Sequence, residues 1–249
     1  MISNHSKNHY QNIANIYDNL WSYSPDYIKF TTQKIIQYLH LNATDTLVDI
    51  GCGTGIYSKE ILHQIQLQQP IICVDNSAEM VEKIPANNRL NPIEMDGVKF
   101  SQKPGIYNKI LLKEAIHHIK EKFILFQNLY QRLTPGGIFL LLLWPPTIEH
   151  PLFTEALESY EKKQPHHQEM INLLQQVGFV VDMDIIEYPL ELPKSQYFEM
   201  VENCYMSLLS EFNDAELAEG LKEIEEKYQD KSVLKFSDRM VFIIATKSK

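Results

Sequence analysis

Short apolar runs alternate with stretches of helical spacing along most of this chain. Runs of strand length occur at residues 47–50, 71–74, 92–95, 107–113, 138–143, 180–186 and 240–246. Between them, apolar side chains recur at helical spacing at residues 57–65, 123–133 and 168–177. Alternating strand and helix signals are typical of an α/β protein with a mostly parallel sheet. With 249 residues, 44% of them hydrophobic, we expect one domain.

The most informative stretch is residues 46–57, where an apolar strand ends in glycines at alternate positions. Leu47, Val48 and Ile50 suit a buried parallel strand. The glycines that follow let the backbone turn sharply and leave room for a ligand; they are Gly51, Gly53 and Gly55. We therefore predict a strand, a tight turn and a helix whose N-terminus faces a crevice above the strand ends.

Two classes of cofactor use such a crevice, and the glycine spacing helps to separate them. Dinucleotide sites favour G-x-G-x-x-G with an acidic residue about twenty positions further on. Here the residues 48–55 read Val-Asp-Ile-Gly-Cys-Gly-Thr-Gly, and Asp75 follows the next apolar run. This pattern resembles the first motif of the class I S-adenosylmethionine-dependent methyltransferases, and later pieces of the chain follow in that family's order.

The resemblance implies a cofactor site along the carboxyl ends of the strands. Asp75 would accept hydrogen bonds from the two ribose hydroxyls, Asn76 and Met80 would flank the adenine, and Asp96 would bind its amino group. Met80 is equally suited to the core. The full set that we assign to cofactor binding is Asp49, Gly51, Cys52, Gly53, Gly55, Asp75, Asn76, Met80, Asp96, Gly97 and Lys113. After Asp96-Gly97 we expect a loop or one turn over residues 98–105.

Residues 107–119 resemble the family's fourth motif, where a strand ends beside the methyl group. The chain departs from it in Asn108, where aspartate is usual, and in Lys113-Glu114, where small residues are common. These two charged side chains can pair with each other or face the substrate. His118 matches a histidine frequent in the family. It either anchors the next helix or acts on the substrate as a general base.

The N-terminal region predicts two helices, one through Ile13 and Leu20 and one starting at Ser24-Pro25. They pack on the sheet, or they form part of a lid over the cofactor. The lid hypothesis uses the aromatic residues Tyr10, Tyr17, Trp21 and Tyr23, because aromatic faces attract a sulfonium cation. Within this set, Tyr17 is our catalytic candidate and Trp21 a substrate-binding one.

The C-terminal half adds candidates for the acceptor pocket. Trp144 follows the strand at 138–143, after the helix stop at residues 134–137. A cap helix with aromatic and sulfur side chains is predicted between Tyr197 and Leu209, and both Tyr197 and Tyr205 are pocket candidates. Residues 215–228 predict a solvated acidic helix with Asp214 as N-cap. If the last strand is antiparallel, as in the family, Arg239 either faces a carboxylate of the substrate or forms an ion pair with Asp238 or another acid.

The predicted organisation is thus a single methyltransferase domain with a Rossmann-like seven-stranded sheet and an antiparallel last strand. It divides into N-terminal lid helices at 1–42, a core at 43–190, a helical cap at 191–232 and the last strand at 233–249.

Composition limits the partners of this domain. The net charge of −9 argues against general nucleic-acid binding, which needs a basic surface. The 3 cysteines are widely spaced, and we therefore expect them to be reduced, as in a cytoplasmic protein. No apolar run has membrane-spanning length, and residues 1–8 do not read as a signal peptide. The 9 histidines show no metal-ligand spacing, and His166-His167 lies in a polar stretch.

The sequence predicts a methyltransferase that moves the methyl group of S-adenosylmethionine to an oxygen or nitrogen of a small molecule without a metal. S-adenosylhomocysteine would be the product. Two alternatives remain open at this stage. One is a non-catalytic S-adenosylmethionine-binding or regulatory protein, and the other is a nicotinamide-dependent oxidoreductase with the same sheet. The acceptor, the general base and the oligomeric state are not determined by these residues.

Overall fold

One seven-stranded sheet organises the protein. The computed structural model describes residues 14–21 and 23–249. The strand order is β3-β2-β1-β4-β5-β7-β6, and every pair is parallel except the two that involve β7. The strands are β1 (Leu47–Ile50), β2 (Ile71–Asp75), β3 (Leu90–Glu94), β4 (Tyr107–Lys113), β5 (Leu133–Leu143), β6 (Val180–Pro193) and β7 (Val233–Thr246). The predicted α/β class and antiparallel last strand are confirmed.

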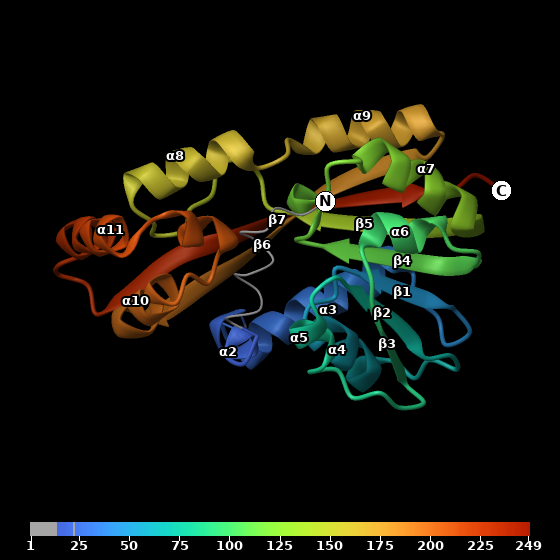
Figure 1. Ribbon diagram of the computed structural model, residues 1–249, viewed down its shortest axis with the longest axis horizontal. Helices are drawn as coiled ribbons and strands as arrows, with labels where there is room; N and C mark the ends of the chain where they lie inside the picture. Colours follow the sequence, from blue (N-terminus) through green and yellow to red (C-terminus); the bar gives the residue numbers. More distant parts are fainter. Residues whose placement is uncertain (1–13, 22) are drawn as a thin grey trace.

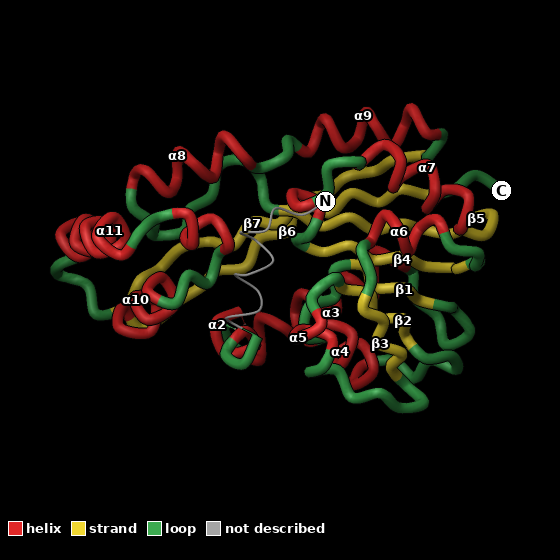
Figure 2. Tube along the Cα trace, in the orientation of Figure 1, coloured by secondary structure: helices red, strands yellow, loops and turns green. Residues whose placement is uncertain are grey.

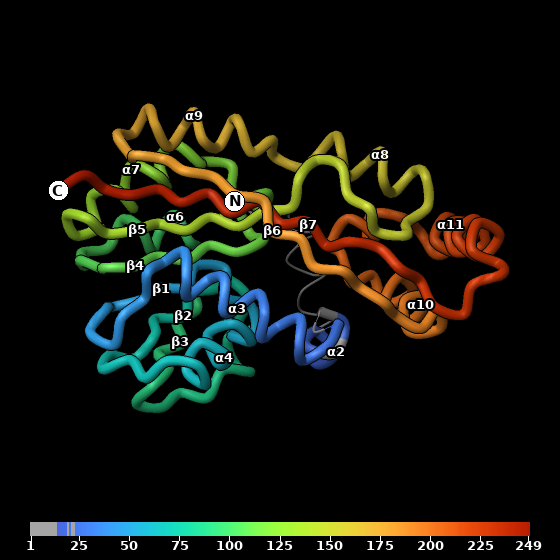
Figure 3. Tube along the Cα trace, turned by 180° about the vertical axis from the view of Figure 1, so that it is seen from behind, coloured from blue at the N-terminus to red at the C-terminus, as the bar shows by residue number. Residues whose placement is uncertain are grey.

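Helices cover both faces of this sheet (Figures 1 and 2). On one face lie α3 and α4, and on the other α6, α7 and α9, as the views from front and behind show (Figure 3). The described helices are α2 (Tyr17–Trp21), α3 (Pro25–Leu39), α4 (Ile56–Gln64), α5 (Ala78–Val81), α6 (Gly97–Gln102), η1 (Ile116–His118), α7 (Lys122–Arg132), α8 (Thr154–Lys163), α9 (His167–Val177), α10 (Lys194–Glu202), η2 (Ser207–Glu211) and α11 (Asp214–Lys227).

Alternation along the central strands produces two apolar cores, one on each face. In β5, Leu140 and Leu142 join the core beneath α3 and α4, whereas Leu141 joins the core beneath α7 and α9. All three side chains are 0% exposed. Because both faces are covered, the strand reads as a continuous apolar run, as expected of a central strand.

Strands β6 and β7 are longer than predicted and carry the cap. They pair without interruption from Val180↔Thr246 to Pro193↔Val233. The predicted strand bounds, 180–186 and 240–246, cover only the half that lies in the main sheet. The other half extends beyond it, toward α8, α10 and α11 (Figure 1). Apolar residues alternating with charges mark this outer half, because only one of its faces is buried.

Several predicted helix bounds differ from the structure. Residues 98–105 were expected to form a loop or one turn, but Gly97–Gln102 is a short helix, because Asp96 caps its N-terminus. The predicted single cap helix is interrupted, since Cys204 adopts a left-handed φ of 50° between α10 and η2. The acidic helix starts one residue earlier than predicted, with Asn213 as N-cap in a capping box.

The N-terminal and neighbouring elements also differ in detail. Helix α2 starts at Tyr17, and Ile13 lies outside the described residues. The second predicted helix is confirmed, with the Ser24 side chain accepting a hydrogen bond from Tyr27 N. Leu133, predicted as the end of a helix, is the first residue of β5. Helix α8 was not predicted at all.

Two findings limit what these residues can form. No helix in the described part of the chain is long and apolar enough to cross a membrane. The three cysteines Cys52, Cys73 and Cys204 are free thiols.

Candidate functional site

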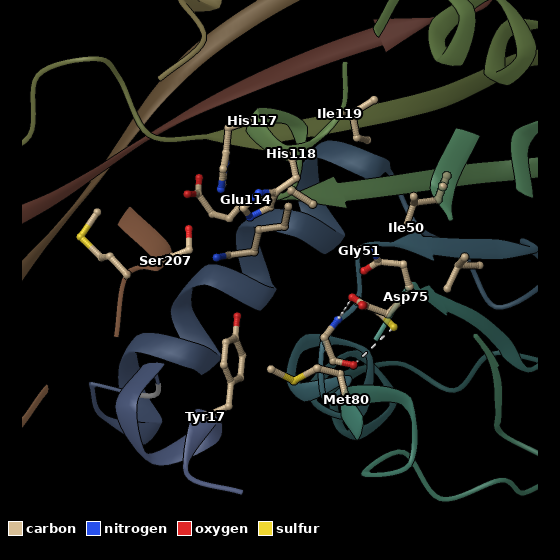
Figure 4. A pocket seen from close by; sticks show the side chains of 18 of the residues that line it. Tyr17, Ile50, Gly51, Asp75, Met80, Glu114, His117, His118, Ile119 and Ser207 are labelled. Carbon is tan, nitrogen blue, oxygen red and sulfur yellow. Dashed lines mark hydrogen bonds between the residues drawn. The ribbon is translucent and has the colours of Figure 1, made fainter. Parts of the chain in front are cut away.

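A cavity of about 450 Å³ lies at the carboxyl ends of β1, β2 and β4. Side chains from α2, the glycine loop, α8 and η2 also line it, so it spans the core and the cap (Figure 4). This volume is within the range of small-molecule and cofactor sites. Because parallel strands place their carboxyl ends at one edge, the sheet brings together residues that are distant in the sequence.

The glycine loop forms the floor of the cavity, and its glycines are required sterically. The N–H groups of Gly51 and Cys52 donate to the Val74 carbonyl at 2.7 and 3.1 Å, which ties the loop to β2. A Cβ at Gly51 would lie 2.5 Å from Ala115 Cβ. Gly53 adopts a left-handed φ of 56° and faces the Tyr17 ring, which a Cβ would approach to 3.6 Å.

Asp75 joins this loop to the start of α5. Its Oδ2 accepts a hydrogen bond from Gly53 N at 2.9 Å, and its Oδ1 accepts one from Ser77 N at 3.0 Å. Burial raises the pKa of the Asp75 carboxyl, and these backbone N–H groups oppose the shift. The carboxyl group is thereby held in a fixed orientation at the cavity wall, where a ligand hydroxyl can reach it.

The wall beyond Asp75 contains the three residues predicted to surround an adenine, together with Gly97. Asn76, Met80, Asp96 and Gly97 all line the cavity. Met80 is 1% exposed, so it lines the cavity as part of the core. Asp96 Oδ1 accepts hydrogen bonds from Val98 N and Lys99 N, both at 3.0 Å, which fixes the side chain as the N-cap of α6.

Two predicted cofactor residues do not line the cavity. Asp49 is 3% exposed and accepts a hydrogen bond from the Ser58 hydroxyl at 2.7 Å, beneath the loop. Gly55 is the N-cap of α4 and lies against Ile84. Both residues shape the loop from behind, while Gly51, Cys52 and Gly53 line the cavity.

Of the proposed aromatic lid, Tyr17 reaches the cavity. Its ring lies over Gly53, on the side of the cavity opposite the end of β4 (Figure 4). The hydroxyl of Thr54, in the glycine loop, donates to Asp18 and so links α2 to the loop. Tyr23 is buried against Tyr27 and does not line the cavity. Tyr10 and the side chain of Trp21 lie outside the described part of the structure.

The end of β4 contributes charged and ionisable groups. Lys113 Nζ lies 4.6 Å from the centre of the Tyr57 ring. Burial lowers the pKa of Lys113, but Tyr57 and Glu114 raise it more, so the net shift is upward. Burial and the neighbouring His118 and Lys122 hold the pKa of His117 well below its usual value. Lys113, Glu114, His117 and His118 all line the cavity.

The far end of the cavity lies between the core and the cap. Trp144, Tyr160, Gln164, Met206 and Leu208 line this end. At its rim, Lys163 of α8 forms a salt bridge with Glu211 of η2. Sequence reasoning placed Trp144 there but missed Tyr160 and Ser207, because α8 was not predicted and the cap was expected as one helix.

Three predicted substrate residues lie away from this cavity. Tyr197 and Tyr205 are 0% exposed and hydrogen-bonded to each other at 3.0 Å, and His150 Nδ1 lies 3.0 Å from the Tyr205 hydroxyl. Arg239 lies within β7 instead of at its start, and it pairs with Glu149 at 3.4 Å. Arg239 therefore forms an ion pair, as one of the two alternatives predicted, and its partner is Glu149 instead of Asp238.

The sheet order and the site define a class of protein. A Rossmann-like sheet with a glycine-rich first turn and an acid at the end of β2 is the arrangement that binds a nucleoside cofactor across the strand ends.

Comparison with known proteins identifies the family. The methyltransferase domain family matches residues 21–184. The chain is 31% identical over 131 residues to malonyl-[acyl-carrier protein] O-methyltransferase 2 of Ilyobacter polytropus, covering 51% of this chain and 49% of that protein. It is 22% identical over 185 residues to a sterol 24-C-methyltransferase of Pneumocystis carinii, covering 67% and 46%. The chain thus spans about half the length of these curated relatives.

A solved structure shows the same fold. It is phosphoethanolamine N-methyltransferase 2 of Haemonchus contortus in complex with phosphomonomethylethanolamine and S-adenosylhomocysteine. The TM-score is 0.61 at 17% identity, covering 96% of this chain and 58% of that one. This chain therefore belongs to the methyltransferase domain family, among the S-adenosylmethionine-dependent class I methyltransferases.

The residues present fit S-adenosylmethionine. The cavity is roomy, its floor has no Cβ at Gly51 or Gly53, and Asp75 is held where a ribose would lie. Met80 adds an apolar group and Asp96 a carboxylate to the cavity wall, a combination that suits an adenine. Among the described residues, no cluster of three or more His, Cys, Asp or Glu side chains could hold a metal ion.

Proposed function

We propose that this protein transfers a methyl group from S-adenosylmethionine to an oxygen or nitrogen of a small molecule, by direct displacement without a metal. The observation that carries the proposal is the coupling of Asp75 to the glycine loop inside a cavity that continues past the cofactor half to the cap. Bound there, S-adenosylmethionine supplies a methyl group already activated on a sulfonium sulfur. The protein then has to orient the acceptor and exclude water.

The roles of the chain follow from where each side chain lies. Asp75 holds the ribose hydroxyls, and Asn76, Met80, Asp96 and Gly97 hold the adenine. The glycine loop and Lys113 lie against the methionine part. Tyr17 closes the cavity above Gly53, and His118 is the sequence-predicted candidate for accepting a proton.

The relatives do not identify the acceptor atom, because their names give O-methylation of malonyl-[acyl-carrier protein], C-methylation of a sterol and N-methylation of phosphoethanolamine. A hydroxyl or ammonium acceptor loses a proton when it is methylated, so it benefits from a proton-accepting side chain. Glu114, His117 and His118 line the cavity at the end of β4 and can serve in this way, which supports a hydroxyl or amine acceptor.

A binding measurement tests the cofactor assignment. We expect S-adenosylhomocysteine to bind the wild type, measured by calorimetry, and NADH not to compete. In Asp75→Ala, loss of two hydrogen bonds to a charged group predicts a fall in affinity of about 100-fold. Asp230→Ala, an exposed acid, is the matched control. Circular dichroism checks that both variants are folded.

Two results would overturn the proposal. One is wild-type affinity in a folded Asp75→Ala protein. The other is tight NADH binding without S-adenosylhomocysteine binding. Turnover is followed by incubating the protein with methyl-labelled S-adenosylmethionine and a metabolite extract, with labelled product detected by mass. A protein that binds the cofactor but labels nothing in such extracts is the non-catalytic binding protein instead.

A further inference from the structure

Glu114 occupies an unusual backbone position beside the methyl-transfer end of the cavity. Its φ is 54°, in the left-handed region that non-glycine residues rarely adopt. Its N–H donates to the Leu142 carbonyl at 2.9 Å, just beyond Lys113, the last residue of β4 that pairs with β5. Successive side chains of a strand point to opposite faces. The left-handed turn allows Lys113 and Glu114 to line the same cavity. Backbone strain of this kind concentrates at functional sites.

One oxygen of the Glu114 carboxyl group lacks a hydrogen-bond partner. Its Oε1 is enclosed and makes no hydrogen bond within the described part of the chain. Burial raises the pKa of Glu114 to about 7, and the nearby Asp238 adds to the rise. Lys113 and the backbone N–H of Trp144 act in the opposite direction without cancelling it. A carboxylate with so few donors is costly to ionise, and a ligand N–H on the part of the carboxyl group that faces the cavity would relieve that cost.

The nearby lysines have partners besides Glu114, although the charge of Lys113 also acts on Glu114. Lys113 lies over the Tyr57 ring, and Lys163 is paired with Glu211 at the rim. His117 is neutral, because its pKa is held well below the usual value, so it does not compete as a cation. Its Nδ1 also makes no hydrogen bond to the described residues. His118 and Tyr160 also line the cavity, and burial raises the pKa of the Tyr160 phenol well above its usual value, so Tyr160 is not anionic at neutral pH.

Two aromatic residues line the cavity together with this carboxyl group. Trp144 is 2% exposed and Tyr160 is 7% exposed, and both line the same end of the cavity. Met206 and Leu208 complete the wall from the cap. Ring faces attract a cation, while the apolar wall suits a carbon frame. An enclosed carboxylate within aromatic and apolar walls matches a protonated amine on an apolar frame better than it matches an anion or a sugar.

We propose that the acceptor is a primary or secondary amine on an apolar frame, which binds as an ammonium ion that donates a hydrogen bond to the Glu114 carboxylate where it faces the cavity. This inference rests on the proposed function and narrows it to N-methylation. In this inference Glu114, instead of His118, accepts the proton of the acceptor.

The chemical step balances with the groups named. The ammonium gives one proton to Glu114, which leaves a lone pair on nitrogen. That lone pair forms the N–C bond to the methyl group, and the electron pair of the broken C–S bond remains on sulfur as a neutral thioether. The methylated product carries the positive charge that the sulfonium lost. Glu114 returns its proton to water when the product leaves.

Matched ligands test the amine. The probes are 2-phenylethylamine and hexylamine, with 2-phenylethanol and hexanol as the neutral isosteres, each titrated into protein saturated with S-adenosylhomocysteine. We expect at least one amine to bind about tenfold or more tightly than its alcohol at pH 8. A hydrogen bond to a charged group is typically worth 1.5–3 kcal/mol, so Glu114→Gln should weaken amine binding about 10- to 100-fold. Alcohol binding should be unchanged.

The pH dependence separates a direct contact from a structural effect. As pH rises through about 7, Glu114 ionises while the amine is still protonated, so amine affinity should increase. In Glu114→Gln this increase should disappear. Glu219→Gln, the same change on the exposed face of α11, should keep it.

The outcomes distinguish this inference from the proposed function. Alcohols that bind as well as both amines, or a Glu114→Gln protein with unaltered amine affinity and pH profile, would overturn the amine assignment while leaving the methyltransferase intact. Loss of S-adenosylhomocysteine binding in the wild type would overturn the proposed function itself. Glu114→Gln must retain S-adenosylhomocysteine affinity, since Asp75 and the glycine loop are unaltered in it.

Discussion

At the end of β1, Asp49 is buried beneath the glycine loop and has one side-chain partner, the Ser58 hydroxyl at 2.7 Å. Burial raises the pKa of this carboxyl from 3.8 to about 6, and the Ser58 hydrogen bond limits the rise. The folded state therefore favours the neutral acid more than the unfolded state does. Asp49 contributes most to stability below about pH 4, and that contribution is lost as pH rises through about 6.

Asp49→Asn tests this linkage. The amide stays neutral at every pH and can still accept the Ser58 hydrogen bond. Relative to the wild type, the free energy of unfolding of the variant should increase by about 1–3 kcal/mol between pH 4 and pH 7. Urea unfolding at several pH values measures the difference. A difference that does not change with pH, or that falls as pH rises, would contradict the raised pKa.

At the scale of the elements, the sequence predicted best where the signal is local. The strand run Leu47–Ile50, the three glycines and Asp75 lie within short stretches whose pattern depends on backbone geometry, and the structure assembles them as expected at one sheet edge. Ser24 and Pro25 predicted the start of α3 for the same reason.

The cap could not be predicted in the same way, because its residues are fixed by tertiary contacts. Only Ala156 and Tyr160 are buried in helix α8, and most of its other residues are charged or polar. Its apolar pattern is therefore weak. No glycine or proline lies next to Cys204, so the sequence does not predict the break in the helix there. Arg239 was placed at a strand start because β7 was expected to begin at residue 240; its pairing with β6 moves it into the strand interior.

Helix α11 offers a prediction at this scale, where two effects oppose each other. Gly220 lies within the helix, and replacing an exposed helical glycine by alanine usually stabilises a protein by about 1 kcal/mol. Here an added Cβ would lie 2.5 Å from the Phe153 ring. Phe153 is 3% exposed and precedes α8, so the ring has little room to move. Because overpacking costs typically 1–3 kcal/mol, the clash should outweigh the gain in helix propensity.

We therefore expect Gly220→Ala to lower the melting temperature, measured by calorimetry. Ala218→Gly is the matched control, since residue 218 is exposed on the same helix and loses only helix propensity. A melting temperature of Gly220→Ala equal to or above that of the wild type would show that α11 and Phe153 do not meet as closely as described.

At the scale of the whole molecule, the β6–β7 hairpin makes the core and the cap one body around one cavity. Buried polar contacts reinforce this connection where the hairpin passes α3. The Tyr27 hydroxyl of α3 donates to Asp238 of β7, and His150 lies 3.5 Å from the same carboxyl group. His150 in turn contacts Tyr205, between α10 and η2. The lid, core and cap thus share contacts that do not depend on a ligand.

Because the cavity is lined from α2, the glycine loop, α8 and η2, a bound ligand contacts separate parts of this body at once. A ligand that binds only the folded state stabilises it by about 2.7 kcal/mol at a concentration 100 times its dissociation constant. For a domain of this size, that corresponds to an increase in melting temperature of roughly 5–10 °C. We expect this increase with S-adenosylhomocysteine and its loss in Asp75→Ala.

Hydrogen exchange of the same complex locates the effect. S-adenosylhomocysteine should slow exchange at residues 51–57, 75–80 and 96–98, where it contacts the loop, Asp75 and Asp96. Adding 2-phenylethylamine should extend the protection to residues 206–211, because η2 lines the far end of the cavity. Helix α11 lines no part of it, and its exposed amides open locally, so residues 214–227 should not change. Protection confined to α11, or absent from the glycine loop, would place the cofactor elsewhere.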